Sequence, residues 1–549
     1  MRKTLLGTAV VILVGAALVA CSSDSESGAA PSGAVGGGAG TAGGYNAGGS
    51  GGGSYWGDAS SGMGGSNYGG AAGSGYAGSA GAGASAGFGG AGGSGTGGAP
   101  PAPDAGTAPD ADAGDADLCA ALDPTKSAVF YLSADDSNSM ASPAIARRLI
   151  SSGQKVPTHI LRTYEFLNYY NVGYAPADAG KLSIVSEMAA GDEPGSYDLQ
   201  IGVASPAAIK PRRPMVLTFV LDTSGSMGGE PITLQRSAVI AIAAQLKAGD
   251  IVSMVTWNTA QQVMLDSHVA TGPNDTKVVS LAKSLSASGG TDLHGGLSKG
   301  YALAQKSFDK NKLNRVVLIS DGMANVGITQ ENIIGDGAQL NDGDGIYLVG
   351  VGVGAGVNDT LMNTVTDAGR GAYVYLDSSQ EASTIFGKRF DETMDVAARS
   401  VGVELRLPWY MGIQVFHGEE YSTNPEVIEP QHLAPDDAMV FNQVIAPCAA
   451  SAFDGADPVE VVVRWQTPTG HAKLETSAKS TLGALLSAPP KYLGKAKAII
   501  AYAEALKKPS TADQELAEAK KLVAAADPNG TDPELKEIAA LIDKAIAIY

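Results

Sequence analysis

Three short segments carry oxygen side chains whose types and spacing suit a cation site. The first has the pattern DxSxS, with a carboxylate and two hydroxyls at alternate positions: Asp222, Ser224 and Ser226. The second places the hydroxyl of Thr291 after two glycines, and the third places the carboxylate of Asp321 in the sequence Ser-Asp-Gly. Hard divalent cations prefer carboxylate and other oxygen ligands. The five side chains therefore predict a metal-binding site.

A parallel sheet would bring these segments together. Apolar runs at 215–221 and 316–319 end directly before the first and the third segment. Both runs are continuous rather than alternating, as is typical of strands buried on both faces. Open α/β sheets bind ligands at the carboxyl ends of their strands. We therefore expect Asp222 and Asp321 to meet at that edge, with Thr291 on a loop beside them.

The middle third of the chain alternates short apolar runs with helical stretches. This alternation predicts an α/β domain with a parallel sheet. Further strands are expected at 251–257 and 346–353, and helices are expected at 232–246, 275–285, 297–308 and 330–339. The sequence around Gly350–Gly356 does not have the GxGxxG register of a nucleotide-binding loop, and it fits the end of a buried strand.

Taken together, the five positions resemble the metal-ion-dependent adhesion site (MIDAS) of von Willebrand factor type A (VWA) domains. That site has the pattern DxSxS, then Thr, then Asp, which corresponds here to Asp222, Ser224, Ser226, Thr291 and Asp321. The resemblance implies a Rossmann-like, doubly wound parallel sheet. It also implies Mg²⁺ as the cation, with Mn²⁺ or Ca²⁺ able to substitute, and an acidic side chain of a protein partner as the last ligand.

A wider resemblance is to bacterial VWA proteins of the YfbK type, over roughly residues 126–549. It rests on the segment LRTYEFLNYY at 161–170, on the loop at 321–327 and on AAADPNG at 524–530. The first of these segments also reads as a packed amphipathic helix with structural aromatic residues. Nothing in it points to catalysis.

The segments on either side of the α/β unit have a different pattern. Stretches of period two at 182–184, 199–203, 401–407 and 459–465 are typical of half-buried antiparallel strands. We therefore expect a β-rich module built from both flanks, with the α/β unit inserted between them. The last 60 or so residues have helical periodicity and predict three helices, at 491–507, 514–526 and 534–548.

The predicted organisation has six parts. They are a signal peptide (1–20), a Gly/Ala/Ser-rich tether (21–118), an N-terminal α+β flank (119–212), the VWA domain (213–399), a C-terminal β-rich segment (400–487) and the C-terminal helices (488–549).

The N-terminus has the pattern of a secretory leader. Arg2 and Lys3 precede an apolar run that ends in Leu-Val-Ala-Cys at Cys21. This ending resembles the lipobox of bacterial lipoproteins, which implies lipidation of Cys21 and anchoring of the chain in the cell envelope. The following Ser22 favours the outer over the inner membrane by the same resemblance. The alternative is a plain signal peptide in which Cys21 is incidental.

The tether and the overall charge limit the classes of partner. No Lys or Arg occurs from Ser22 to Leu118, and Gly, Ala and Ser dominate there, so we expect disorder. The whole chain has 37 basic and 56 acidic residues and a formal net charge of −19. This acidity argues against nucleic acid as a partner and favours cations.

Two cysteines besides Cys21 remain, Cys119 and Cys448. An oxidising compartment permits them to form a disulfide. The alternative is two separate thiols, since the sequence does not show their distance.

The sequence motifs give little support for an enzymatic function. The six histidines include no HExxH pair, and the chain has no P-loop. His294 lies three residues after Thr291, and accepting a proton from metal-bound water is the one hydrolytic role that this pattern allows. The simpler interpretation is a histidine at the start of a helix.

Two classes of function remain, and neither is an enzyme. The first is a lipid-anchored module that binds a protein partner with an exposed Asp or Glu through its cation. The second is a structural or sensory envelope protein in which the VWA domain is a metal-stabilised scaffold.

Overall fold

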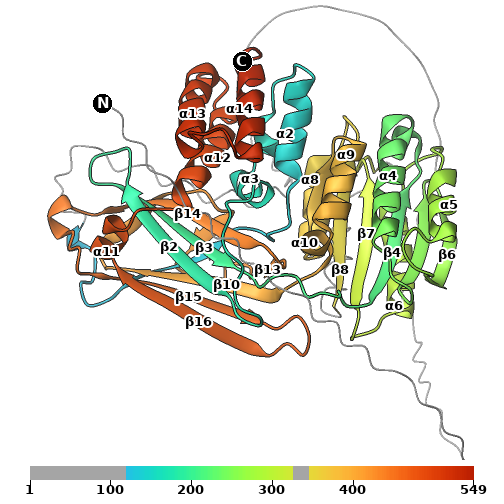
Figure 1. Cartoon of the computed structure of the whole chain (residues 1–549), viewed down its shortest axis with the longest axis horizontal. Coiled ribbons are helices and arrows are strands. Elements are labelled where there is room, and N and C mark those ends of the chain that lie inside the picture. The colour runs from blue at the N-terminus through green and yellow to red at the C-terminus, as the bar shows by residue number, and fades with distance from the viewer. Residues whose placement is uncertain (1–118, 325–344) are drawn as a thin grey trace, which may run out of the picture. The chain divides into compact units, whose positions relative to one another are not determined.

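The computed structural model describes residues 119–324 and 345–549. The predicted signal peptide, Cys21, the tether, the helix at 330–339 and the loop after Ala324 lie outside the described residues. Figure 1 shows the described part of the chain as two β-sheets and a group of helices beside an α/β unit.

The central sheet has the strand order β6-β5-β4-β7-β8-β9. All neighbouring strands are parallel except β5 and β6, which are antiparallel. Strands β4, β7 and β8 are buried along their whole length, as their continuous apolar sequences predict. The strands are β4 (Met215–Asp222), β5 (Ile251–Trp257), β6 (Gln261–Val269), β7 (Leu313–Ser320), β8 (Ile346–Val353) and β9 (Tyr373–Leu376).

Helices cover both faces of this sheet, which makes it doubly wound. On one face α6 and α8 pack against alternate side chains such as Val220 and Val316. On the other face α4, α5, α9 and α10 pack against Phe219 and Val317. The helices are α4 (Glu230–Ala244), α5 (Thr276–Ser284), α6 (Leu293–Lys306), α8 (Asp359–Ala368), α9 (Ser379–Ser383) and α10 (Phe390–Met394).

The predicted elements of the α/β unit agree with the observed ones to within a few residues. Helix α6 begins at Leu293, four residues before the predicted start, because Asp292 caps it by accepting a hydrogen bond from the backbone of Gly295. Strand β6 was not predicted. It is an edge strand with several exposed side chains, so it lacks the continuous apolar run by which its neighbours were found.

Two antiparallel sheets form the β-rich module, and each contains strands from both flanks. The first has the order β12-β1-β10-β15-β16, with β13 also paired to β10, and the second has the order β11-β14-β3-β2. The pairing of β1 with β10 and of β3 with β14 confirms the predicted insertion of the α/β unit between the flanks. The strands are β1 (Ala128–Ser133), β2 (Ser183–Ala190), β3 (Tyr197–Ala204), β10 (Ala398–Leu407), β11 (Met411–Phe416), β12 (Glu420–Ser422), β13 (Gln431–Leu433), β14 (Ala438–Pro447), β15 (Pro458–Gln466) and β16 (Lys473–Thr481).

A disulfide joins Cys119 to Cys448, with the two Cα atoms 5.3 Å apart. Cys119 precedes β1, and Cys448 directly follows β14. The bond therefore closes the module around the inserted domain, and it spans 329 positions of the sequence.

The C-terminal helices pack in one cluster with two helices of the N-terminal flank (Figure 1). The ring centroids of Tyr502 and Phe166 lie 5.7 Å apart inside this cluster. The contact with the β module is polar at Glu187 of β2, which accepts the backbone N–H groups of Tyr492 and Leu493. The helices of this cluster are α2 (Ala141–Ser151), α3 (Thr163–Tyr169), α12 (Leu493–Leu506), α13 (Ala512–Ala526) and α14 (Pro533–Ile546). Helix α11 (Leu482–Ser487) packs instead in the core of the β module.

Among the helices of residues 119–324 and 345–549, none combines the length and the hydropathy needed to cross a membrane.

Candidate metal-binding site

The five predicted ligands lie on three segments at the carboxyl edge of the central sheet. Asp222 is the last residue of β4, and Ser224 and Ser226 lie in the turn after it. Asp321 directly follows β7, which is the parallel neighbour of β4. Thr291 lies just before α6 and is buried. The two carboxylates are thus brought to one edge because their strands are adjacent.

Hydrogen bonds hold the DxSxS turn around the Asp222 carboxylate. One carboxylate oxygen accepts the backbone N–H of Ser224 at 2.8 Å, and the other accepts the hydroxyl of Ser320 at 2.6 Å. The hydroxyl oxygens of Ser224 and Ser226 lie 3.0 Å apart. The turn therefore gathers hydroxyl oxygens beside a carboxylate whose orientation is fixed.

Backbone hydrogen bonds attach the loop before Thr291 to the same turn. The N–H of Gly225 donates to the carbonyl of Gly289 at 3.0 Å, and the N–H of Ser288 donates to the carbonyl of Thr223 at 2.7 Å. Gly289 has a φ of +84°, and a Cβ at Gly225 would lie only 3.2 Å from the Gly289 oxygen. The positive φ favours glycine at position 289, and the missing side chain of Gly225 leaves room for this close approach.

Helix α8 supports the loop that carries Asp321. The N–H of Asn358 donates to the backbone carbonyl of Asp321 at 2.8 Å. Gly322 has a φ of +70°, and a Cβ there would meet Asn358 at 3.1 Å. The loop therefore turns back against the start of α8, next to Asp359.

Burial concentrates negative charge at this edge. Asp222 is 0% exposed and Asp321 is 4% exposed. The pKa of Asp222 is raised to about 6, chiefly because burial removes its hydration and to a smaller extent because of the charge of Asp321, while the hydrogen bonds from Ser320 and Ser224 act in the opposite direction. Among the described residues, no Lys or Arg forms an ion pair with either carboxylate. Two buried carboxylates and clustered hydroxyls form a donor set that fits a hard divalent cation.

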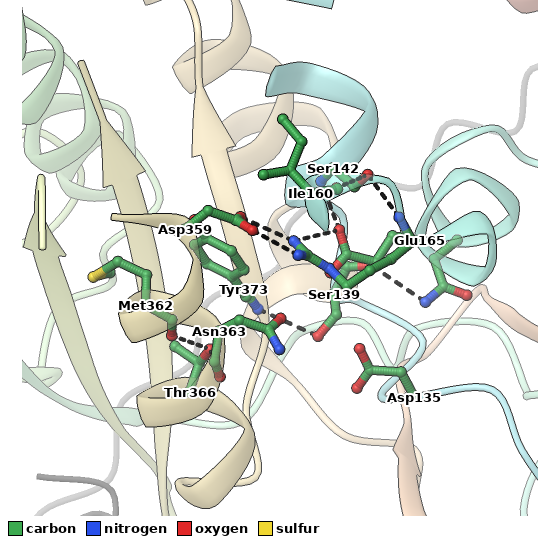
Figure 2. Close-up of polar contacts among 12 residues, drawn as sticks. Asp135, Ser139, Ser142, Ile160, Glu165, Asp359, Met362, Asn363, Thr366 and Tyr373 are labelled. Atoms are coloured by element: carbon green, nitrogen blue, oxygen red, sulfur yellow. Dashed lines mark hydrogen bonds and ion pairs between the residues drawn. The ribbon is translucent and has the colours of Figure 1, made fainter. Parts of the chain in front are cut away.

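A buried arginine connects this edge to the N-terminal flank. Arg162 donates to both carboxylate oxygens of Asp359, at 2.7 and 3.0 Å, and to Glu165 at 2.7 Å. Glu165 also accepts the backbone N–H of Ser142 at 2.6 Å, and Figure 2 shows the side chains of Asp359 and Glu165 in this network. Asn358 and Asp359 are consecutive residues at the start of α8. Asn358 binds the backbone of Asp321 and Asp359 binds Arg162, so these two residues link the Asp321 loop to the start of α3.

The segment at 161–170 thus has a structural role, as its helical pattern indicates. The segment consists mainly of helix α3, and the side chain of Phe166 in this helix is buried against the C-terminal helices. His294 lies half-buried in the first turn of α6, which agrees with the simpler of its two interpretations.

Sequence reasoning missed a second group of carboxylates, formed by Asp135, Asp367 and Glu419. Their nearest oxygens lie within 4.8 Å of one another, although they come from the loop after β1, from α8 and from the loop before β12. Burial raises the pKa of Glu419 to about 7 and that of Asp367 to about 6. No sequence pattern joins the three residues. We assign no metal to them, because no other feature of the described structure points to a ligand there.

Comparison with known proteins agrees with the fold. A family model described as "von Willebrand factor type A domain" matches residues 217–388. The protein YfbK of Escherichia coli (strain K12) is 27% identical over 284 residues, which are 48% of this chain and 48% of YfbK. The protein sll0103 of Synechocystis sp. is 25% identical over 42% of this chain and 54% of its own length. The chain therefore aligns with only about half the length of these relatives.

A solved structure titled "von Willebrand factor type A from Catenulispora acidiphila" also matches. It is 15% identical, has a TM-score of 0.43, and the match covers 65% of this chain and 89% of that one.

The matched segment runs from β4 to the helical turns after β9, and it contains all five predicted ligands. Its parallel sheet, its helices on both faces and its DxSxS turn at the carboxyl edge agree with the family match. Residues 217–388 of this chain are therefore a von Willebrand factor type A domain, which the chain shares with bacterial VWA proteins such as YfbK.

Proposed function

We propose that the chain is a lipid-anchored protein of the cell envelope that binds a protein partner through a divalent cation. The cation is held by Asp222, Ser224, Ser226, Thr291 and Asp321, and Mg²⁺ is the ion that suits them best. The role is binding and not catalysis. VWA domains commonly mediate interactions between proteins, and this chain contains one.

The observation that carries the proposal is the composition of the site. Two buried carboxylates, Asp222 and Asp321, balance the charge of a divalent cation, while the hydroxyls that complete the set are neutral. Protein carboxylates alone do not fill the six or so oxygen positions of such an ion. The ion would present positive charge at the carboxyl edge, where a carboxylate of a partner is a suitable further ligand.

The charge of the chain makes the cation decisive for partner choice. With a net charge of −19, the chain repels acidic partners at long range, although salt screens this repulsion beyond about 8 Å. A bound cation neutralises the negative charge of the site and offers an open coordination position to a carboxylate of the partner. We therefore expect partner binding to require the cation and to be abolished by EDTA.

The membrane anchor and the location rest on the sequence around Cys21, which lies outside the described residues. We propose lipidation of Cys21 and attachment to the outer membrane. Metabolic labelling with a radioactive fatty acid, followed by membrane fractionation, tests this with Cys21→Ser as the variant. Unchanged labelling and membrane attachment in the variant would contradict lipidation at Cys21.

One observation favours a second candidate function, a metal-stabilised scaffold. The Asp321 segment is linked through Asn358 and Asp359 to Arg162 of the flank. A cation at Asp321 would then stabilise the contact between the domain and its flank, without any partner.

Calorimetric titration of Mg²⁺ and Mn²⁺ into the purified chain tests the site itself. We expect saturable binding that is lost in Asp222→Ala and retained in Asp178→Ala, which removes an exposed carboxylate of the flank. If wild type binds neither ion, or if Asp222→Ala binds as wild type does, the proposed site is wrong.

A pull-down from envelope extract then separates the two functions. Cation-dependent capture of a partner, absent with EDTA and with Asp222→Ala, supports the binding module. If the cation raises only the melting temperature and captures nothing, the scaffold is the better account.

A further inference from the structure

A second candidate binding site lies at the opposite edge of the central sheet. A cleft of about 470 Å³ opens at the amino ends of β4, β7 and β8, where the turn between β15 and β16 faces them. Strands β4 and β7 are eight residues long, so roughly 25 Å of sheet separates this cleft from the predicted cation site. The two sites can therefore be tested independently.

The cleft is strongly basic in a chain that is acidic overall. No Asp or Glu occurs among its described lining residues, whereas the chain as a whole has 56 acidic and 37 basic residues. The lining includes five Lys and Arg side chains and one histidine, and these are Arg213, Lys310, Lys312, Arg315, Arg399 and His471.

Two of these arginines are almost completely buried. Arg315 is 4% exposed and Arg399 is 7% exposed, and their guanidinium carbons lie 4.9 and 5.0 Å from the centroid of the Tyr347 ring. Arg315 also donates to the backbone carbonyl of Asn314 at 2.8 Å. Burial lowers the pKa of Arg315 to about 10, and the charges of Arg213 and Arg399 contribute to this shift. The structure thus holds like charges close together in a place with little water.

Two described carboxylates, Asp395 and Asp136, lie near these arginines. Each neutralises the positive charge of the arginines only in part. Asp395 pairs with Arg213 at 2.7 Å, and the same oxygen accepts the backbone N–H of Val396. Asp136 lines a small neighbouring cavity with Arg315, but burial raises its pKa to about 8, so it is largely uncharged at neutral pH. An anion in the cleft would reduce the repulsion among the like charges of the lining.

We propose that this cleft binds the phosphate group of a small molecule. The planar guanidinium group matches the geometry of phosphate and can donate two parallel hydrogen bonds to it. Lys310 and Lys312 lie at the more exposed part of the lining and add attraction for a doubly charged group. The volume is within the range of small-molecule sites, and the side chains of Tyr347 and Phe308 provide apolar surface for the rest of the ligand.

Calorimetric titration of the purified chain, without divalent cations, tests the proposal. The probes are inorganic phosphate, glycerol 3-phosphate and citrate. We expect saturable binding of a phosphate-bearing probe, tighter than binding of citrate. The stronger of the two phosphate probes shows whether the ligand is free phosphate or a phosphate ester. EDTA and Asp222→Ala should leave this binding unchanged, so the outcome is independent of the cation site.

Two sets of variants assign the binding to the cleft. Lys310→Gln with Lys312→Gln removes two partly exposed charges, and we expect roughly fivefold weaker binding with the fold intact. The matched control is Lys126→Gln with Lys181→Gln, two exposed lysines outside the cleft that should bind as wild type does. Arg315→Lys keeps the charge and removes the planar fork, and we expect roughly tenfold weaker binding.

Two results would overturn the proposal. The first is no saturable binding of either phosphate probe by wild type, and the second is equal binding by wild type and the Lys310/Lys312 variant.

Discussion

The carboxyl edge and the amino edge of the central sheet gather buried charges of opposite sign. At the carboxyl edge, Asp222 and Asp321 lie side by side with hydroxyl groups around them. At the amino edge, Arg315 and Arg399 lie over one aromatic ring with lysines nearby. In both places like charges are held close together with little water, and binding of an ion of the other sign would relieve their repulsion.

The difference shows that net charge is a poor guide to local sites. A chain with a charge of −19 holds a basic cleft because the segments that meet at one edge carry several of its cations. Burial matters as much as residue type, since it raises the pKa values of all three carboxyl groups of Asp135, Asp367 and Glu419, to about 6 for Asp367 and about 7 for Glu419.

The largest expected effect is a loss of stability when the buried ion pairs of Arg162 are removed, because these ion pairs join the N-terminal flank to the start of α8. Arg162→Met leaves the buried carboxylates of Glu165 and Asp359 facing each other without their cation. We expect the free energy of unfolding to fall by about 3–5 kcal/mol. Urea denaturation measures this, and a titration with Mg²⁺ shows whether the loss also weakens the cation site.

The control for this variant is Arg464→Met. Arg464 is half exposed and pairs with Glu404 and Glu475 in the β module, so its loss should cost less than about 1 kcal/mol. Equal effects of the two variants would mean that the buried arginine contributes no more than a surface one.

The second prediction separates the two edges directly. Asp222→Ala should weaken Mg²⁺ binding by at least about a hundredfold, which corresponds to about 2.7 kcal/mol, and leave phosphate binding unchanged. Arg315→Lys should do the reverse. If either variant weakens both kinds of binding equally, the edges are not independent, and the contrast between them fails.

The third prediction concerns pH and the carboxylates near the amino edge. Burial raises the pKa of Glu419 from 4.5 to about 7, with further contributions from Asp367, Glu420 and Glu429. The folded chain therefore binds more protons than the unfolded chain between these values, so stability falls as pH rises from about 5 to about 8. In Glu419→Gln this loss should be smaller by on the order of 1–2 kcal/mol.

Denaturation in EDTA at several pH values measures the effect. Glu426→Gln is the matched control, because Glu426 is an exposed carboxylate of the following loop. A pH dependence that is the same in both variants would show that Glu419 is not the group that titrates.

The smallest expected effect is that of His294→Ala. His294 lies in the first turn of α6, close in sequence to Thr291, but none of the site's oxygen ligands depends on it. We expect Mg²⁺ affinity to change by less than about twofold. A large loss of Mg²⁺ affinity would show that His294 takes part in the cation site, and it would support the hydrolytic interpretation.

The fold was predictable where a strand or helix has a strong local pattern. Strands β4, β5 and β8 were found because burial on both faces requires a continuous apolar run. Strand β6 was missed because one side of it is exposed at the edge of the sheet. The three C-terminal helices were found from their periodicity, whereas their packing against α2 and α3 required the tertiary structure.

The two sites differ in the same way. The candidate cation ligands were predicted because three of the five lie within five residues and the others belong to short local motifs. The lining of the basic cleft comes from five separate segments of the chain, so no pattern in the sequence joins them. The carboxylates Asp135, Asp367 and Glu419 were missed for the same reason.

The sequence by itself determined the α/β class, the positions of the candidate ligands at strand ends, and the presence of β-rich flanks, because hydrophobic periodicity and short motifs are local properties. Only the tertiary structure decided which strands of the two flanks pair, that Arg162 joins Asp359 to Glu165, and that Arg315 lies beside Arg399. These contacts depend on how distant segments close onto one another. That closure is set by the packing of the whole chain, and no single segment encodes it.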